Sequence, residues 1–396
     1  MLNSNSKKMV VIAGLSITGL AVGRLLGREG LAVIGVDANG SCSGGYSKYI
    51  KKVVLNNEDD DTLVHTLVNI AENQVEKPVL FIDNDRYIAI VEKFRQKLEK
   101  YYTLTLPPSD VLKQLFDKYL LHKLCLGANI DVPITFYVNT IEDYRRFEYE
   151  VPLPCIIKPA YSYHNKKLKY KAKIVETREE ILPNIREASS LGIPILLQEM
   201  IPGSDDNHFS VAVYFDRHNM PIAHFTSQKY FQTPQSSGIG VLMASIKDTG
   251  FKDIAVKLLN QINYKGIAEI EFKKDNRDNK FKLIEVNIRP WMQISLAEKC
   301  GINFPLLAFR DVTNEEMALI PKAQRDAIWL YMKPLMINLI KKGRYSEILI
   351  FFKSRGFARI IKGEIVFALF ALDDFSPFFK DTMFSIAKLL HHSVKK

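Results

Sequence analysis

The sequence predicts a mixed α/β and α+β protein in three parts, and three observations support this fold class. Short apolar runs alternate with helical patterns over residues 1–105. Residues 106–310 are richer in strand-like runs and contain a hairpin pattern with a polar turn. From residue 311 to residue 396 the pattern is mainly helical and basic. Strands separated by helices indicate a parallel sheet, whereas strands joined by a short polar turn indicate antiparallel pairing.

The first 105 residues are expected to form a Rossmann-like domain. The runs "MVVIAG", "LAVIGVD", "KKVVL", "KPVLFID" and "YTLTLP" predict its strands. Gly14 and Gly19 follow the first run, but their spacing does not match the strict dinucleotide fingerprint. A nucleotide-dependent oxidoreductase that uses Asp37 is therefore a weaker alternative. The apolar run after Lys7 and Lys8 resembles a signal peptide, but its glycines and the strand after it favour a folded domain.

Composition indicates a globular protein with reduced cysteines. Hydrophobic residues make up 47% and charged residues 25% of the chain, as in proteins with a substantial core. The four cysteines are far apart in the sequence and have no metal-ligand spacing, which favours free thiols and a cytoplasmic location. They are Cys42, Cys125, Cys155 and Cys300.

Positive charge is concentrated towards the C-terminus. The formal net charge is +10, and residues 321–396 contain fourteen Lys and Arg against six Asp and Glu, a surplus of eight. Such a segment can contact an anionic membrane or an acidic partner, or it can simply be a solvated basic face. We expect no nucleic-acid partner, and a homodimer is compatible with the sequence.

The second part begins with a helical pattern and two strands. A long amphipathic helix is expected after Pro107–Pro108, with Ser109 as its N-cap and Lys118 inside it. Lys158 ends the apolar strand "PCIIKP", where a lysine either extends to solvent or binds an anion. The runs "EEILPNIREASSLG" and "IPILLQEMIPG" predict a helix and a strand that stops at a Pro-Gly turn.

The segment "GIAEIEFKKDNRDNKFKLIEVNIRPW" predicts a hairpin whose turn is "KDNRDNK". Alternate residues of a strand share a face. Glu285, Asn287 and Arg289 are therefore expected on one face of the second strand. Ile284 and Val286 are expected on the opposite face.

Antiparallel pairing of this hairpin would bring Glu271 close to Glu285 and Asn287. Carboxylate and amide oxygens suit Mg²⁺ that carries nucleotide phosphates. Without a cation, two adjacent carboxylates repel each other and the pKa of one rises. A solvated acidic hairpin is the simpler interpretation, so the cluster alone does not decide the function.

The order of these motifs resembles the ATP-grasp superfamily of carboxylate-amine ligases. The motifs are Lys118, "IIKPA" with Lys158, "LLQEMIPG", and "EIEF" followed by "IEVNIR". The likeness covers roughly residues 9–310 and is greatest to the branch that contains D-aspartate ligase and the carbamoyl phosphate synthetase-like ligases. It implies a pre-ATP-grasp domain over 1–105 and an ATP-grasp module over 106–310. Within that module, a lid subdomain at about 135–200 and a metal-binding core at about 201–310 are expected.

The resemblance also implies roles for single residues. ATP would be bound through phosphate-binding lysines, an adenine hinge and a ribose-binding aspartate. These nucleotide-binding residues would be Lys118, Lys158, Gln198, Glu199, Met200, Ile201, and Asp205 or Asp206. Glu271, Glu285 and Asn287 would bind Mg²⁺, with Mn²⁺ as an alternative metal. Arg289 would offset the charge of the acyl phosphate, and Lys229 would lie on the substrate side of the phosphates.

One loop departs from the family pattern. Many members have a glycine-rich loop that covers the phosphates, but the corresponding segment here is "YSYHNKKLKY", which has no glycine. Its lysines at positions 166, 167 and 169 would replace backbone amides in that role. The glycine-containing segment Ser236–Val241 and His208 are weaker candidates for the same site.

These observations predict an ATP-dependent ligase that activates a carboxylate as an acyl phosphate and joins it to an amine. Its partners would be a small-molecule carboxylate and an amine. A non-catalytic ATP-binding scaffold at a membrane surface is a second alternative, beside the oxidoreductase. A carboxylase or carbamoyl phosphate branch is less favoured because no biotin-attachment or glutaminase segment is present.

Overall fold

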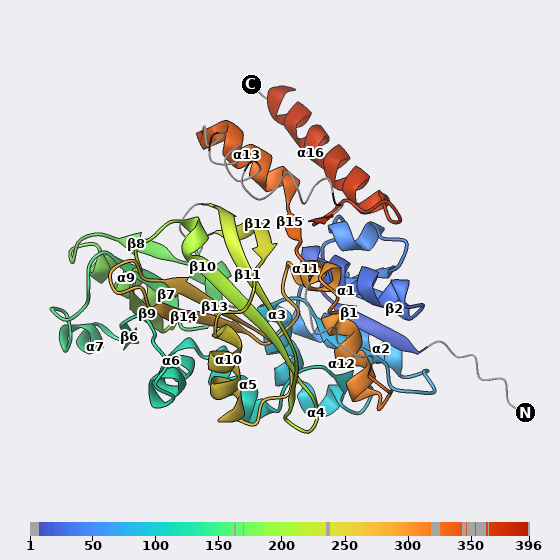
Figure 1. The fold of residues 1–396 in the computed structure, drawn as a ribbon, viewed down its shortest axis with the longest axis horizontal. Coiled ribbons are helices and arrows are strands. Elements are labelled where there is room, and N and C mark those ends of the chain that lie inside the picture. Colours follow the sequence, from blue (N-terminus) through green and yellow to red (C-terminus); the bar gives the residue numbers. More distant parts are fainter. Residues whose placement is uncertain are drawn as a thin grey trace, which may run out of the picture. The chain divides into compact units, whose positions relative to one another are not determined.

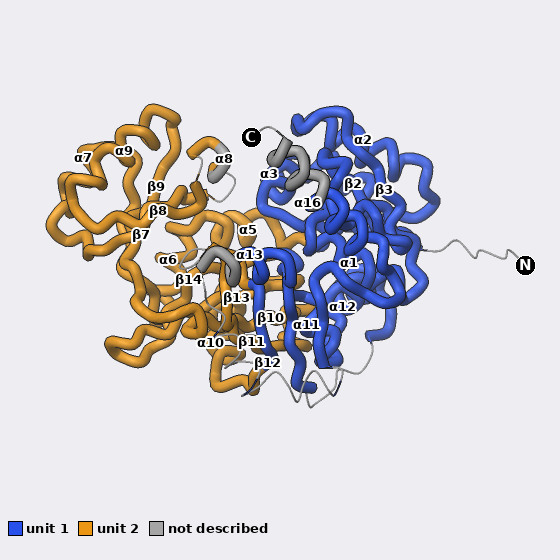
Figure 2. Tube along the Cα trace, turned by 90° about the horizontal axis from the view of Figure 1, so that it is seen from above, with its two compact units in different colours: residues 1–105, 241–245, 289–396 blue, residues 106–240, 246–288 orange. Residues whose placement is uncertain are grey.

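The structure is a computed structural model of residues 1–396. It describes residues 8–161, 164–168, 170–234, 238–317, 325–342 and 364–394, together with Ser346, Lys353 and Lys362. Figure 1 labels the helices and strands. The chain forms two compact units, which Figure 2 shows in different colours. Unit 1 comprises residues 1–105, 241–245 and 289–396, and unit 2 comprises residues 106–240 and 246–288.

A five-stranded parallel sheet forms the centre of the first hundred residues, as predicted. Its order is β3-β2-β1-β4-β5, and every strand pair in it is parallel. The central strand β1 is fully buried from its second residue onward, because its apolar run has no polar alternation. The strands are β1 (Met9–Ala13), β2 (Ala32–Asp37), β3 (Lys51–Val54), β4 (Val79–Ile82) and β5 (Thr103–Leu104).

Helices connect these strands and continue in the C-terminal part of unit 1. The N-terminal helices are α1 (Ile17–Arg28), η1 (Ser43–Tyr46), α2 (Asp60–Ala71), α3 (Asp85–Lys93) and α4 (Arg95–Leu98). The later helices are α11 (Ile294–Lys299), α12 (Phe304–Val312), α13 (Met332–Lys342) and α16 (Ser376–Val394). In the described parts of the chain, no helix is both long enough and apolar enough to cross a membrane.

Two short strands and most of a third also belong to unit 1. Strand β12 (Ile239–Ser245) pairs through its last residues with β15 (Ile328–Leu330) in antiparallel fashion. Strand β15 in turn pairs with β16 (Ile365–Phe367) in parallel. Two C-terminal strands therefore accompany the helices of the basic segment, which is less purely helical than its sequence pattern predicts.

A buried ion pair attaches the C-terminal segment to α1. The guanidinium of Arg24 donates to Asp374 Oδ2 at 2.9 Å, and its second branch donates to the carbonyl of Leu369 at 2.8 Å. Ser47 Oγ donates to the same Asp374 oxygen at 2.6 Å. One turn further along α1, Arg28 makes a more exposed pair with Asp373 at 2.8 Å. Residues 373–374 therefore tie the end of the chain to the first domain of unit 1.

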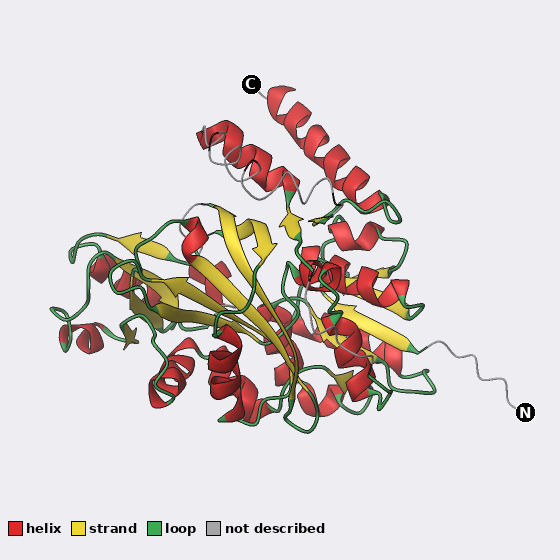
Figure 3. Ribbon diagram, viewed as in Figure 1, coloured by secondary structure: helices red, strands yellow, loops and turns green. Residues whose placement is uncertain are grey.

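Unit 2 contains two antiparallel sheets (Figure 3). The smaller sheet has the order β6-β9-β7-β8 and packs against α7 (Ile141–Arg145) and α9 (Ile181–Ser190) around its own apolar core. Its strands are β6 (Thr135–Val138), β7 (Cys155–Pro159), β8 (Lys173–Val175) and β9 (Ile195–Glu199), with α8 (Asn165–Leu168) between β7 and β8. We call this sheet and its helices the lid.

The larger sheet of unit 2 has the order β14-β13-β10-β11, which we call the core sheet. Its strands are β10 (His208–Phe215), β11 (Pro221–Thr233), β13 (Gly266–Lys274) and β14 (Phe281–Asn287). The other helices of unit 2 are α5 (Ser109–Phe116), α6 (Lys118–Gly127), η3 (Asp205–Asn207) and α10 (Phe251–Asn260). The predicted hairpin is confirmed as β13 and β14, joined by residues 275–280.

The long helix expected after residue 108 is divided in two. Asp117 has extended backbone angles of φ −84° and ψ 111°, and its carboxylate accepts from the amides of Tyr119 and Leu120. It ends α5 and is the N-cap of α6. Ser109 makes no side-chain cap, so the prediction that it caps one long helix was wrong. Lys118 consequently occupies the first turn of α6 and not a helix interior.

A β-bulge changes the faces of β14. Glu271 pairs with Glu285, but the next residue, Phe272, pairs with Leu283, so Ile284 is an extra residue in the second strand. Leu283 and Val286 are both buried, although three positions separate them. Strict alternation was therefore wrong on the N-terminal side of the bulge, and it holds from Glu285 to Asn287.

The two ion pairs on α1 allow a test of the C-terminal attachment. Replacing Asp374 by Asn leaves Arg24 buried without its counter-charge, so we expect the free energy of unfolding to fall by about 3–5 kcal/mol. The matched control, Asp373→Asn, breaks a pair that is more than a third exposed and is expected to cost less than about 1 kcal/mol. Urea unfolding followed by circular dichroism measures both values. Equal losses would show that burial of the Arg24 pair does not fasten this segment.

Candidate active site

Four acidic and amide side chains meet on neighbouring strands of the core sheet. Glu269 and Glu271 of β13 lie opposite Asn287 and Glu285 of β14 in the strand register. Asn287 Nδ2 donates to Glu269 Oε2 at 3.1 Å and to Glu271 Oε1 at 3.2 Å. The hairpin therefore brings together the three metal-binding candidates of the sequence and adds Glu269.

Two lysines balance the charge of this cluster. Lys118 Nζ lies 3.3 Å from Glu285 Oε1, and Lys229 Nζ lies 3.8 Å from Glu271 Oε2. Lys229 extends from β11, whereas Lys118 begins α6. Opposite charges at this separation reduce the repulsion between carboxylates that share a site.

Lys158 is the most buried lysine of the group. Its side chain leaves β7 and donates to Gln198 Oε1 at 2.8 Å, and Gln198 Nε2 in turn donates to Thr135 Oγ1 at 2.9 Å. Burial, and after it the charge of Lys118, lower the pKa of Lys158 from 10.5 to about 7, against the opposing effect of the two glutamates. A buried ammonium beside a second ammonium creates a strong demand for an anion.

Local contacts hold Lys118 against the lid. Its backbone N–H donates to the carbonyl of Ala160 at 3.2 Å, directly after β7. The hydroxyl of Tyr161 donates to Asp117 Oδ2 at 2.6 Å, while the other oxygen of Asp117 caps α6. The segment that carries Lys158 therefore also fixes the start of the helix that carries Lys118.

Glu199, expected in the adenine hinge, has an additional set of partners. Its carboxylate pairs with Arg277 and lies 3.2 Å from Lys282 Nζ, and it accepts from the Ile134 N–H at 3.1 Å. Burial alone would raise the pKa of Glu199, but the hydrogen bonds from Arg277, Ile134 and Lys282 outweigh it and lower that pKa. Asp275 in the hairpin turn binds the same Arg277 and Lys282. We call these four charged side chains the Glu199–Arg277 cluster; it connects the lid to the core hairpin.

The remaining hinge and ribose candidates follow β9. The Met200 N–H donates to the carbonyl of Pro154 at 3.4 Å, and Ile201 is buried. Asp205 is also buried and accepts from the backbone and side chain of Gln232 at 3.3 and 3.1 Å. Asp206 is exposed, and its side chain accepts from Ser204. The two aspartates therefore differ: Asp205 fastens η3 to β11, and Asp206 faces solvent.

Several weaker candidates are placed only in part. His208 lies opposite Lys229 in the β10 and β11 register, and burial with the nearby lysines lowers its pKa to about 2. Its neutral ring suits a structural role. Lys167 is exposed. Lys169 and residues 235–237, and the side chain of Lys166, lie outside the described part of the structure.

Arg289 belongs to unit 1, where its guanidinium donates to Asp85 Oδ1 at 2.8 Å and to the carbonyl of Pro290 at 3.0 Å. Asp85 is the first residue of α3, so this pair lies within unit 1. The role of Arg289 toward an acyl phosphate stays a prediction.

The glycine turn after β1 does not resemble a dinucleotide site. The Leu15 N–H donates to Asp37 Oδ2 at 2.7 Å, and the Ser16 N–H donates to Asp83 Oδ2 at 2.9 Å. A Cβ at Gly14 would lie 1.7 Å from Asp83 Oδ1. In dinucleotide-binding proteins, amides at this turn receive a pyrophosphate. Here the two amides donate to the carboxylates of Asp37 and Asp83 in the same domain. This removes support from the oxidoreductase alternative.

Sequence reasoning missed four residues of the site region. Glu269 could have been found, because it lies two positions before Glu271 and therefore on the same strand face. No sequence pattern marked the other three residues, because each contacts a partner that is distant in the sequence. Arg277 pairs with Glu199, Tyr161 donates to Asp117, and Gln232 donates to Asp205.

The oxygen atoms of the acidic cluster can be compared with the ligands that a metal ion requires. Within the described residues, no group of three or more His, Cys, Asp and Glu side chains has an arrangement that would hold a metal by itself. The pair Glu271 and Glu285 supplies two carboxylates, and Asn287 supplies an amide oxygen. Such an oxygen set fits Mg²⁺, which is usually held by one or two carboxylates together with phosphates and water.

Comparison with known proteins defines the class. Residues 117–310 match the family of ATP-binding domains described as carbamoyl-phosphate synthase L chain, ATP binding domain. This part of the chain is therefore an ATP-grasp domain, and the family predicted from the order of motifs is confirmed.

Two curated relatives are similar in sequence. D-aspartate ligase of Enterococcus faecium is 24% identical over 351 residues, which cover 79% of this chain and 83% of the relative. The carbamoyl phosphate synthase large chain of Methanocorpusculum labreanum is 25% identical over 195 residues, covering 46% of this chain and 17% of the relative. The chain is thus a homologue of D-aspartate ligase over most of both lengths.

Solved structures show the same fold at lower identity. N5-carboxyaminoimidazole synthetase from Staphylococcus aureus in complex with ADP has a TM-score of 0.66 and 13% identity, with 86% of each chain covered. Biotin carboxylase from Campylobacter jejuni has a TM-score of 0.63 and 17% identity, with 83% of this chain and 75% of that chain covered.

The low pKa of Lys158 gives a pH-dependent test. Because the folded pKa of about 7 lies below the ordinary 10.5, the unfolded chain binds more protons between pH 7 and pH 10. Wild-type stability should therefore rise with pH in this window relative to Lys158→Met, by about 1 kcal/mol per pH unit. Unfolding in urea at pH 7, 8 and 9 measures the difference. Lys280→Met, at an exposed lysine, serves as the control, and a similar slope for both variants would contradict the burial of charge at Lys158.

Proposed function

We propose that this protein is an ATP-dependent ligase that activates a carboxylate as an acyl phosphate and joins it to an amine. The observation that carries the proposal is the meeting of Glu271, Glu285 and Asn287 with Lys118 and Lys229 in one cluster of unit 2. Metal-binding oxygens and cations side by side are what a nucleotide triphosphate and its metal require. The ATP-grasp domain and the D-aspartate ligase relative support the same reaction class.

In this proposal Glu271, Glu285 and Asn287 would hold Mg²⁺, or Mn²⁺, together with the nucleotide phosphates. When bound, the metal would neutralise phosphate charge during transfer. Glu269 would position Asn287, because it accepts from the amide nitrogen and leaves the amide oxygen as the remaining donor to a cation. The three lysines Lys118, Lys158 and Lys229 would bind phosphate oxygens as positive charges.

The base and ribose would lie along the segment after β9. The segment from Glu199 to Ile201 would contact adenine in this proposal, and the Met200 N–H would exchange its 3.4 Å bond to Pro154 for one to the base. Gln198 would orient Lys158 from β9. The Glu199 carboxylate already has its own partners, so we assign it to the connection between lid and hairpin. We assign the ribose hydroxyls to the exposed Asp206, because Asp205 is committed to Gln232.

The reaction itself needs positioning more than covalent chemistry from the protein. A carboxylate oxygen attacks the γ-phosphorus of ATP, the bond to the β–γ bridging oxygen breaks, and ADP leaves. The amine nitrogen then attacks the acyl carbon, phosphate leaves, and the amine gives up a proton to solvent as the amide forms. Arg289 would offset the charge on the acyl phosphate.

The similarity to D-aspartate ligase indicates which carboxylate substrates should be tested first. Because D-aspartate ligase is similar over most of the chain, we propose an amino acid as the carboxylate, with D-aspartate among the candidates. The membrane scaffold alternative predicts ATP binding without turnover, and the oxidoreductase alternative predicts NAD binding without ATP binding. A homodimer stays a prediction.

Release of ADP over a panel of carboxylates and amines tests the function. We expect ADP release above the ATP-only background for at least one pair, with stoichiometric amide detected by mass spectrometry. The panel should contain D- and L-amino acids, other carboxylates, ammonia and primary amines, each with Mg²⁺ and with Mn²⁺. Tight NAD binding together with no ATP binding would overturn the ligase assignment.

Replacement of Glu285 by Ala is the sharpest single-residue test. The change removes a proposed metal oxygen and leaves Lys118 without its ion pair, but Glu285 is only partly buried, with 35% of its side chain exposed, so the fold should persist. We expect ADP release to fall by about a thousandfold. Circular dichroism checks the fold, and Glu187→Ala on the exposed face of α9 serves as the control. Wild-type turnover in Glu285→Ala would refute the metal-binding role.

A further inference from the structure

The C-terminal helices of unit 1 expose a large number of apolar side chains. On α13, Met332, Met336 and Ile337 are 44–47% exposed, and on and before α16, Phe375, Phe379 and Met383 are 48–50% exposed. Phe375, Phe379 and Met383 follow one another at intervals of four residues, which places them along one side of the segment. Contiguous apolar exposure of this kind marks an interaction surface more often than scattered single residues do.

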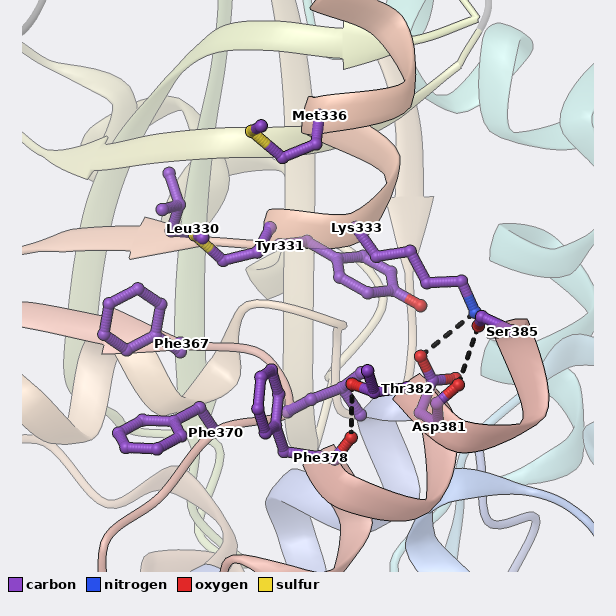
Figure 4. Close-up of a pocket in the computed structure, with 12 residues that line it drawn as sticks. Leu330, Tyr331, Lys333, Met336, Phe367, Phe370, Phe378, Asp381, Thr382 and Ser385 are labelled. Atoms are coloured by element: carbon purple, nitrogen blue, oxygen red, sulfur yellow. Dashed lines mark hydrogen bonds and ion pairs between the residues drawn. The ribbon is translucent and has the colours of Figure 1, made fainter. Parts of the chain in front are cut away.

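An apolar pocket lies between the two helices (Figure 4). It has a volume of about 250 Å³, and Met336 on α13, Phe367 and Phe370 around β16, and Phe378 on α16 contribute to its wall. At its edge, Lys333 Nζ pairs with Asp381 Oδ2 at 3.0 Å, so the polar groups are confined to the rim. An apolar recess beside an apolar stripe extends the surface that a hydrophobic partner can cover.

The charge of the segment favours an anionic partner. Helices α13 and α16 together contain five lysines and one acidic residue, namely Lys333, Lys341, Lys342, Lys380 and Lys388 against Asp381. Asp373 pairs with Arg28, Asp374 pairs with Arg24, and Asp381 pairs with Lys333. Lys380 is exposed next to Phe379 on α16. A second copy of this surface would bring two positive segments together, so self-association through it is disfavoured.

We propose that the surface formed by α13 and the segment 372–385 docks onto an anionic phospholipid membrane. Helices with an apolar stripe and basic neighbours lie in the interface of a bilayer, where burial of side chains and attraction to anionic headgroups add together. The phenylalanines and methionines insert among acyl chains, and the lysines contact the headgroups. One consequence rests on the proposed function: a docked ligase would act on substrates that are present at a membrane.

Flotation with vesicles tests the docking surface on the full chain. Vesicles of phosphatidylcholine alone and of an equal mixture of phosphatidylcholine and phosphatidylglycerol are compared at low and high salt. We expect binding to the anionic vesicles at low salt, a reduction of several-fold at 0.5 M salt, and a reduction of about tenfold in the double variant Phe379→Ser with Met383→Ser. Met220→Ser, at a residue of unit 2 that is 58% exposed, is the matched control and should bind as wild type does.

Three outcomes would overturn the proposal. The first is no flotation of the wild type with anionic vesicles, and the second is equal flotation of the wild type and the double variant. The third is a dimer of the wild type in the absence of lipid that becomes a monomer in the double variant but not in the control. The surface would then be an interface between two copies of the chain. Circular dichroism of the double variant confirms that the fold is intact, so loss of binding cannot be attributed to unfolding. ADP release in solution is independent of this surface and should be unchanged.

Discussion

The arrangement of unit 2 depends on mutual neutralisation of like-charged groups at close range. Two carboxylates on paired strands would repel each other, and so would lysines that converge from separate elements. They coexist because Lys118 faces Glu285 and Lys229 faces Glu271. In the proposed complex, nucleotide phosphates and a divalent cation would replace these two ion pairs, and one balanced set of charges would be exchanged for another.

A second charged cluster, the Glu199–Arg277 cluster, connects the lid to the core hairpin. Glu199 at the end of β9 and Asp275 in the hairpin turn share Arg277 and Lys282, so the lid and the hairpin are joined through four side chains. Asp275 is completely buried, and hydrogen bonds from Arg277 hold its pKa below the ordinary range. Burying these charges is tolerable because each has partners of the opposite sign. The predicted nucleotide-binding segment begins at the same residue, Glu199.

Much of the fold could be predicted from the sequence because local pattern and tertiary structure agree there. The parallel strands are uninterrupted apolar runs, and the hairpin has a polar turn at the position where β13 ends. The failures have a common cause. The break at Asp117 is accompanied by a hydrogen bond from Tyr161, and the bulge at Ile284 is visible only in the pairing of β13 with β14. Such causes lie outside any local window of sequence.

In the candidate site, too, some features could be predicted from local sequence and others depend on distant residues. Residue types and spacing pointed to the carboxylates of the hairpin, and the resemblance to the ATP-grasp superfamily pointed to the lysines. The structure brings Lys118 and Lys229 to these carboxylates. The same reasoning could not separate Asp205 from Asp206, since the distinction comes from Gln232 on a different strand. It also could not foresee that the amides after β1 are satisfied by Asp37 and Asp83, which closes that turn to a phosphate.

The contact between α6 and the end of β7 has a mechanical consequence. Because the Lys118 amide donates to the Ala160 carbonyl and the Tyr161 hydroxyl donates to Asp117, the start of α6 is linked to the end of β7, which carries Lys158. Lys229 and the glutamates belong to the core sheet. A displacement of β7 relative to the core sheet would therefore shift Lys118 and Lys158 together, and it would change the distances of both lysines from the acidic hairpin.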